Sequence, residues 1–249
     1  MGLEAWPADV RVKTLILCGG RGTRLREYTE TVPKVLVEIG GKPILWHIMK
    51  GYAQYGFVEF VLAVGYLGDQ VREKVAVESA PTWSVRVADT GLETGTGGRV
   101  LNARDHLDGG YFFATYGDGL ADIDLTKLRD FHQAHGHVAT VTVVRPRIQF
   151  GVVTLGEGGR VDSFKEKPQV DGWVNGGYFV FDDRVFGYLS PDSILEGDVL
   201  QRLVADGELM AYPHDGYWAC MDTYKDTARL NAEWAAGNAA WRTWEADGS

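Results

Sequence analysis

The stretch LILCGGRGTRLREYTETVPK, residues 15–34, decides how the chain begins to fold. The apolar run VKTLIL at 12–17 is rich in β-branched residues and ends at two glycines, which predicts a buried strand. Four cations follow within fifteen residues: Arg21, Arg24, Arg26 and Lys34. Glycine lets the backbone approach a ligand and arginine matches phosphate oxygens, so the loop is expected to bind a polyphosphate. A surface turn with solvated arginines is the alternative.

Strand and helix patterns alternate after this loop. Pro43 opens a segment whose apolar residues fall on one helical face, as expected of a helix that covers a sheet. Further strands are expected at 60–64, 84–89 and 111–116, and helices at 69–78 and 97–107. This alternation predicts an α/β fold with an open, mostly parallel mixed sheet and helices on both faces.

The pattern changes after Gly119. A helix is expected at 125–136, and Gly-bounded strands at 138–144, 151–156, 159–166 and 176–182 predict a mixed or antiparallel extension of the same sheet. Helices at 194–207 and 224–244 complete the chain. We expect a short N-terminal tail, 1–11, and a single domain, 12–249, in which 12–120 binds a nucleotide and 121–249 closes over it.

Composition excludes several classes of function. The net charge of −9 and the pI near 5.2 disfavour a nonspecific nucleic-acid binder, which is normally basic. Two distant cysteines, Cys18 and Cys220, suggest neither a disulfide framework nor a zinc site, so a reducing cytoplasm is expected. No apolar run reaches the roughly 18 residues of a membrane span, and no signal peptide is recognisable.

Two familiar phosphate motifs do not fit the loop. The dinucleotide fingerprint needs a glycine where the chain has Leu25, and the P-loop needs Ser or Thr where Pro43 follows Lys42. Three short motifs instead resemble, in order and spacing, the signature of the sugar-1-phosphate nucleotidyltransferases: GGRGTRL at 19–25, PK at 33–34 and GGKPIL at 40–45.

The resemblance implies a Rossmann-like nucleotidyltransferase fold and a role for the loop. In that family the loop wraps a nucleoside triphosphate, the arginine at position 24 braces the departing pyrophosphate, and the lysine at position 34 contacts the phosphate under attack. The nucleotide-binding residues that it implies are Leu17, Gly19, Gly20, Gly22, Thr23, Arg24, Lys34, Thr94, Arg99 and Gly117. Arg24, Lys34, Asp118 and Asp222 would carry catalysis.

Two aspartates are candidate metal ligands. Asp118 follows an apolar strand and stands between two glycines, although an Asp-Gly turn is the alternative. Asp222, in GYWACMDT, would by itself be taken as a helix cap. In the resembling family both aspartates hold Mg²⁺, an ion that prefers a few carboxylates together with water and phosphate oxygens.

The second half carries the motifs that the family uses for its sugar phosphate. In FKEKP, residues 164–168, the resemblance implies that Glu166 binds sugar hydroxyls and that Lys167 binds the sugar's phosphate. It also places three further residues against the sugar, namely Gly151, Asn175 and Gly176.

One branch, the glucose-1-phosphate cytidylyltransferases, is resembled along nearly the whole chain after residue 11. It implies transfer from CTP to α-D-glucose 1-phosphate, which gives CDP-glucose and pyrophosphate with Mg²⁺. The same chemistry with UTP, dTTP, or another hexose, heptose or cyclitol 1-phosphate stays open. So does a non-catalytic sugar-nucleotide-binding regulator. The segment 77–89 is shorter than its counterpart in that branch, where it is associated with subunit packing. A homo-oligomer is therefore neither required nor excluded.

Histidines and tryptophans outside these motifs suggest packing. The cluster of His132, His135 and His137 is expected to be a solvated helix end and not a metal site. Near the C-terminus, Trp234, Trp241 and Trp244 are expected to pack or to contact another subunit.

Overall fold

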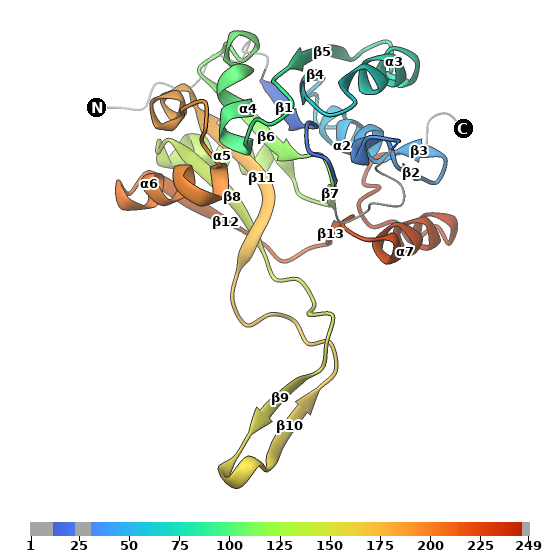
Figure 1. Ribbon diagram of the computed structural model, residues 1–249, viewed down its shortest axis with the longest axis vertical. Coiled ribbons are helices and arrows are strands. Elements are labelled where there is room, and N and C mark those ends of the chain that lie inside the picture. The colour runs from blue at the N-terminus through green and yellow to red at the C-terminus, as the bar shows by residue number, and fades with distance from the viewer. Residues whose placement is uncertain (1–11, 23–30, 246–249) are drawn as a thin grey trace.

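A seven-stranded sheet forms the centre of the computed structural model, which describes residues 12–22 and 31–245 (Figure 1). The strand order is β12-β8-β11-β6-β1-β4-β5. All pairs of neighbours are parallel except those that β11 makes with β6 and β8. The predicted mostly parallel mixed sheet is therefore confirmed.

Both faces of this sheet are buried. In β1, Leu15 packs into one hydrophobic core and Ile16 into the other, because successive side chains of a strand point to opposite faces. The strands are β1 (Lys13–Leu17), β4 (Glu59–Val64), β5 (Ser84–Asp89), β6 (Tyr111–Tyr116), β8 (Ala139–Val144), β11 (Val174–Asp182) and β12 (Leu209–His214).

Helices cover each face. The core that contains Ile16 is completed by α2 (Ile44–Ala53), α3 (Gly68–Glu78), α5 (Leu125–His135) and α7 (Tyr224–Ala235). The core that contains Leu15 is completed by α4 (Thr96–Asn102), the 3-10 helix η5 (Asp183–Tyr188), the π-helix η6 (Leu195–Val199) and α6 (Leu200–Ala205). None of the helices in the described ranges combines the length and the apolar content that crossing a bilayer requires.

The edge of the sheet beyond β1 is where a ligand is expected. β1 lies between β4 and β6, and all three strands run in the same direction. The strand order reverses at this point, and in open α/β sheets ligands bind beyond the carboxyl ends of strands at such a reversal. The glycine loop starts here, with the Cys18 N–H donating to the Ala63 carbonyl and the Tyr66 N–H donating to the Gly19 carbonyl.

Two short antiparallel ladders flank this edge. One joins β7 (Gly119–Ala121) to β13 (Trp218–Cys220), and the other joins β2 (Glu38–Ile39) to β3 (Lys42–Pro43). A single 3-10 turn, η2 (Lys34–Leu36), precedes β2.

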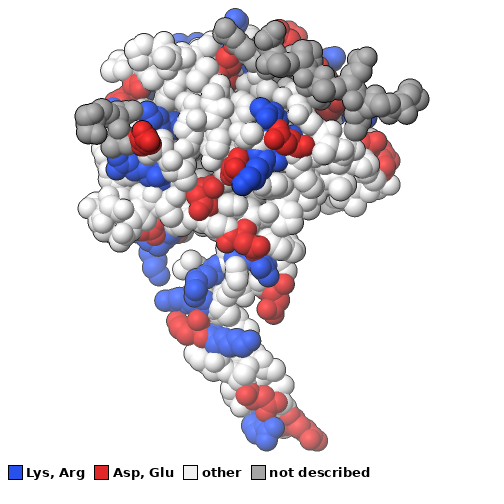
Figure 2. Space-filling view, turned by 180° about the vertical axis from the view of Figure 1, so that it is seen from behind, with Lys and Arg blue, Asp and Glu red and all other residues white. Residues whose placement is uncertain are grey.

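A two-stranded arm projects from the body. Within residues 12–22 and 31–245, β9 (Val152–Leu155) and β10 (Val161–Lys165) pair only with one another, and they extend away from the sheet (Figure 1). The expectation that 151–156 and 159–166 extend the main sheet is therefore wrong. The arm buries little of its apolar surface, since Leu155 is 68% and Phe164 64% exposed. Figure 2 shows Lys and Arg close to Asp and Glu along the arm, so the face seen there carries charges of both signs.

Two helices are shorter than expected. The helix expected at 97–107 ends at Asn102 and is followed by a 3-10 turn, η3 (Arg104–His106). The helix expected at 224–244 ends at Ala235, because Gly237 takes a φ of 72°. The segment after it returns Trp241 and Trp244 to the core beside His47, which confirms their packing role within the chain.

Candidate active site

Asp118 and Asp222 meet although they are far apart in the sequence. β7 pairs with β13 so that Gly119 lies opposite Cys220, and the Met221 N–H donates to the Asp118 carbonyl at 2.9 Å. This ladder places the residue before β7 beside the segment after β13. One ligand atom each from Asp118, Cys220 and Asp222 lie within 4.8 Å of one another.

Lys34 lies between the two aspartates. Its Nζ donates to Asp118 Oδ2 and, at 2.7 Å, to Asp222 Oδ1. Burial by itself lowers the pKa of Lys34, but the two carboxylates outweigh burial and raise that pKa above its usual value. Lys34 therefore stays protonated at neutral pH. The ammonium group acts here as a fixed positive charge and not as a base.

The donor set of this cluster suits a hard cation. Burial, followed by the charges of Asp118 and Asp222, raises the pKa of the Cys220 thiol. A thiol sulfur suits soft metal ions, whereas Mg²⁺ prefers oxygen ligands. Two carboxylates then remain as the donors, which matches the preference of Mg²⁺ for a few carboxylates plus water and phosphate oxygens.

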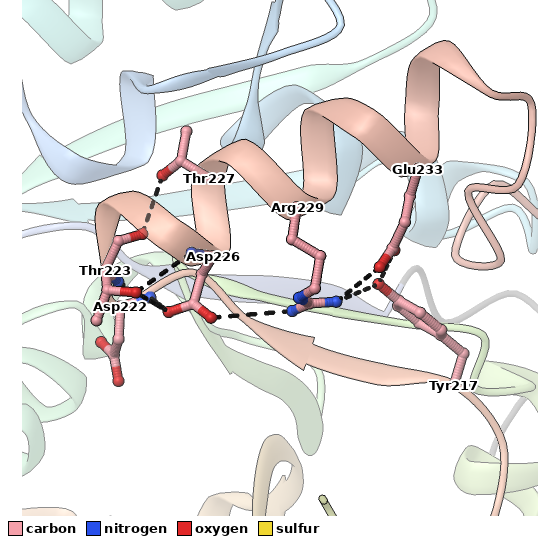
Figure 3. A network of polar contacts seen from close by, with 7 residues as sticks. All are labelled: Tyr217, Asp222, Thr223, Asp226, Thr227, Arg229 and Glu233. Atoms are coloured by element: carbon pink, nitrogen blue, oxygen red, sulfur yellow. Dashed lines mark hydrogen bonds and ion pairs between the residues drawn. The ribbon is translucent and has the colours of Figure 1, made fainter. Parts of the chain in front are cut away.

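A polar network at the start of α7 fixes Asp222 (Figure 3). Asp226 Oδ2 accepts from the backbone N–H of Asp222 at 3.2 Å and from that of Thr223 at 2.9 Å. Thr223 and Asp226 also form a reciprocal capping box, and Arg229 lies 4.0 Å from Asp226. The helix cap that Asp222 would have provided is thus supplied by its neighbours, which leaves the Asp222 carboxylate to face Lys34.

The glycine loop lines a cleft next to this cluster. Gly117 must lack a side chain here, because a Cβ would lie 2.4 Å from Val35 Cγ1. Residues of the predicted nucleotide and sugar sets that line the cleft are Leu17, Gly19, Gly20, Gly22, Lys34, Thr94, Arg99, Gly117, Asp118, Asn175, Gly176 and Asp222. Two predicted residues, Thr23 and Arg24, lie outside the described residues.

Arg99 is buried beneath the glycine loop, in contact with Gly19. It is 5% exposed, and a Cβ on Gly19 would lie 2.1 Å from its Nη1. Burial lowers the pKa of the Arg99 guanidinium. Its Nη atoms donate to the Gly19, Val64, Gly91 and Leu92 carbonyls and to Thr90 Oγ1. In this arrangement Arg99 organises the wall of the cleft, and its contact with a nucleotide stays a prediction.

A second cavity adjoins the cleft. Trp218, Cys220 and Asp222 line both, and Trp218 Nε1 donates to the Gly176 carbonyl at 2.8 Å. Lys167 lines the second cavity together with Asp222, and its contact with a sugar phosphate stays a prediction. Its φ of 44° is rare for a residue with a side chain and costs about 1 kcal/mol.

The neck of the arm holds Lys167 beside a cation that sequence reasoning missed. The Ile148 N–H donates to the Pro168 carbonyl at 2.8 Å and the Val170 N–H to the Pro146 carbonyl at 3.0 Å. Arg147, between these bonds, lines the second cavity together with Lys167. It belongs to no recognisable motif, so the sequence carried no signal for it.

Two predicted sugar-binding residues lie apart from both cavities. Gly151 is at the base of the arm, where a Cβ would lie 2.5 Å from Phe164 Cζ and 3.2 Å from Glu166 Oε2. Neither Gly151 nor Glu166 is among the residues that line the cleft or the second cavity. Their contact with a sugar stays a prediction. The cleft wall instead contains Tyr116 and Glu196, which the sequence motifs did not indicate.

The sequence matches a known family and named relatives along most of its length. The sequence pattern of the nucleotidyl transferase family matches residues 13–237. The chain is 42% identical over 255 residues to a probable glucose-1-phosphate cytidylyltransferase of Bacillus subtilis, covering 94% of this chain and all of the relative. It is 41% identical over 258 residues to the glucose-1-phosphate cytidylyltransferase of Salmonella typhi, with the same coverage.

Solved structures show the same fold at lower sequence identity. HddC from Yersinia pseudotuberculosis, solved in complex with GMP-PN, superimposes with a TM-score of 0.73 at 22% identity and covers 90% of this chain and 99% of its own. The chain belongs to the nucleotidyl transferase family and is similar to its glucose-1-phosphate cytidylyltransferases.

Proposed function

We propose that the protein transfers a cytidylyl group from CTP to α-D-glucose 1-phosphate, giving CDP-glucose and pyrophosphate. One observation carries the proposal: Lys34, Asp118 and Asp222 converge where the glycine-lined cleft meets the cavity that contains Lys167. The glycine loop and Thr94 would bind the nucleotide, and the second cavity would bind the sugar phosphate. The curated relatives are named for this reaction, which favours CTP and glucose over other pairs.

The reaction needs two anions to meet. An oxygen of the sugar phosphate attacks the α-phosphorus, the bond from this phosphorus to the bridging oxygen breaks, and pyrophosphate leaves with the electron pair. The contribution of the protein is position and positive charge. Lys34 would stabilise the charge on the α-phosphate, Lys167 would hold the attacking phosphate, and Arg24 would brace the departing pyrophosphate.

Asp118 and Asp222 would hold Mg²⁺, which when bound would offset charge on the phosphates of both substrates. In the described structure the Lys34 ammonium lies between these carboxylates. Substrate phosphates offer Lys34 other anionic partners, so its side chain could turn to the α-phosphate as the carboxylates take the ion.

A matrix of substrates tests the proposal. Each of CTP, UTP, dTTP, ATP and GTP is combined with glucose, mannose, heptose and cyclitol phosphates, and pyrophosphate release is followed with Mg²⁺ and with EDTA. We expect CTP and glucose 1-phosphate to give the highest kcat/KM and EDTA to abolish release. A different preferred sugar would keep the chemistry and change the substrate. Release from no pair would reject the proposal in favour of a non-catalytic sugar-nucleotide binder.

A further inference from the structure

Four polar side chains form a continuous hydrogen-bonded chain along one wall of the cleft. They are Thr96 at the start of α4, Tyr116 at the end of β6, Asn175 in β11 and Glu196 in the π-helix η6. Thr96 Oγ1 bonds to Glu196 Oε2 at 2.8 Å, the Tyr116 hydroxyl bonds to Glu196 Oε1, and Asn175 Nδ2 bonds to the Tyr116 hydroxyl at 3.2 Å. The chain joins four elements that are distant in the sequence.

The direction of every bond in this chain is fixed. Asn175 Oδ1 accepts from the Gly177 N–H at 2.8 Å, so its Nδ2 must be the group that donates to Tyr116. Burial, followed by the charge of Glu196, raises the pKa of Tyr116, which therefore keeps its proton and donates it to Glu196. Thr96 Oγ1 accepts from the Leu195 N–H at 2.9 Å and in turn donates to Glu196.

Two hydroxyl protons, those of Thr96 and Tyr116, are donated to the Glu196 carboxylate. Glu196 receives a hydroxyl donor on each oxygen, and an ionised carboxylate has about four acceptor positions and no donor. Its remaining capacity is therefore for accepting only. A group that completes the site must donate an O–H or N–H bond.

The charge of Glu196 narrows the choice of ligand. A carboxylate repels phosphate, and the cleft is proposed to hold a triphosphate on its glycine and lysine side. Glu196 is suited to an uncharged part of a substrate. Asn175 precedes Gly176, whose carbonyl accepts from Trp218, and Trp218 also lines the cavity that contains Lys167. The Asn175 end of the hydrogen-bonded chain thus lies next to the side proposed for the sugar phosphate, and Glu196 is connected to it through Tyr116.

We propose that Glu196 accepts a hydrogen bond from a hydroxyl group of the sugar 1-phosphate and so helps to select the sugar. Thr96, Tyr116 and Asn175 are positioning residues that hold the carboxylate in place. The proposal rests on the proposed sugar-nucleotide synthesis and adds a residue to it.

Glu196→Gln tests the proposal because it removes the charge and keeps the shape. We expect the KM for glucose 1-phosphate to rise about tenfold, as a charge-assisted hydrogen bond becomes a weaker neutral one, with the KM for CTP unchanged. Tyr116→Phe should also raise the KM for glucose 1-phosphate, by a smaller factor. Glu73→Gln, an exposed carboxylate on α3, is the matched control and should alter neither constant.

A series of deoxyglucose 1-phosphates identifies the hydroxyl. The wild type should discriminate against one deoxy analogue, and Glu196→Gln should lose discrimination at that same position. A rise confined to the KM for CTP would overturn the proposal and assign Glu196 to an amine of the base. Unchanged constants, or equal losses for every analogue in both proteins, would also overturn it.

Binding separates this proposal from the proposed function. Calorimetric titration of glucose 1-phosphate, with Mg²⁺ and a non-hydrolysable CTP analogue present, needs no turnover. Weaker binding to Glu196→Gln than to the wild type supports the inference even if no product forms. Equal affinities in the two proteins contradict it even if the wild type is active.

Discussion

The two sides of the candidate active site are built differently. The nucleotide side stands on the ends of β1, β4 and β6, whose register is fixed by side chains buried on both faces of the sheet. The sugar-phosphate side includes Lys167, which lies at the neck of an arm that packs against no core. The comparison teaches that a rigid sheet sets the position of the glycine loop and of Asp118, whereas a few backbone hydrogen bonds set the position of Lys167.

The largest expected effect is on the rigid side. Asp118→Asn should reduce kcat about 100-fold or more, because the cluster loses a charged oxygen where charge must be offset. The melting temperature should change little, since the aspartate is partly exposed and faces the cleft. Pyrophosphate release and thermal melting measure the two effects. Wild-type turnover in the variant would remove Asp118 from the mechanism.

The positioning of Asp222 gives the next largest effect. Asp226→Ala removes the acceptor of the Asp222 and Thr223 N–H groups and should lower kcat about tenfold. Stability should fall by about 1 kcal/mol with the lost capping box. Urea denaturation and initial rates check both numbers. A stability loss without any change in kcat would show that Asp222 does not depend on this network.

On the arm side, Lys167→Ala should raise the KM for the sugar 1-phosphate about tenfold and leave the KM for the nucleotide unchanged. The effect is smaller because the lysine side chain is about half exposed and solvent screens its charge. Lys165→Ala, two residues earlier at the end of β10, is the control. A defect confined to the nucleotide would contradict the division between the two sides.

Low pH should lower the free energy of unfolding of the protein. Burial, then a neighbouring histidine, lowers the pKa of both His132 and His135 to about 4. Titratable groups that face them are Asp182, Arg184, Glu208 and His137. The contribution of these two histidines to the free energy of unfolding is fully present above about pH 6.5, near their pKa in the unfolded chain. It declines as the pH falls toward 4, because the unfolded chain then binds more protons than the folded one. Urea denaturation across this range should show the decline, and His132→Gln should flatten it.

Shortening the arm should have the smallest effect. Joining Val153 to Phe164 through an Asn-Gly turn keeps the first two pairs of the ladder and removes its exposed end. The melting temperature and the KM for CTP should stay unchanged, since the deleted residues pack against nothing else in the described chain. A large loss of stability would mean that body and arm are not independent.

The parts of the fold that depend on buried periodicity could be predicted. The strands around the nucleotide side carry apolar runs, and Asp118 lies just after one of them, so its place at a strand end was foreseeable. The arm was placed wrongly in the main sheet, because β9 and β10 have the same strand propensity as buried strands. The pattern of residues alone does not reveal whether a pair of strands will join a larger sheet.

Contacts between distant segments escaped prediction for a similar reason. The β7–β13 ladder is three residues long on each side, too short for any pattern, yet it brings Asp222 to Asp118. His132 was expected at a solvated helix end, but it is 2% exposed and bonded to Thr140. Glu196 lies in a π-helix turn that no local signal marks, and only the assembled cleft shows its hydroxyl neighbours.

Anomalous scattering from a crystal grown with Mn²⁺ and CTP tests the central claim most directly. The account predicts one peak at a bonding distance of about 2 Å from carboxylate oxygens of both Asp118 and Asp222, with Lys34 turned toward the α-phosphate. A peak bound to neither or to only one of the two aspartates, or Lys34 still bridging them beside a bound triphosphate, would contradict it.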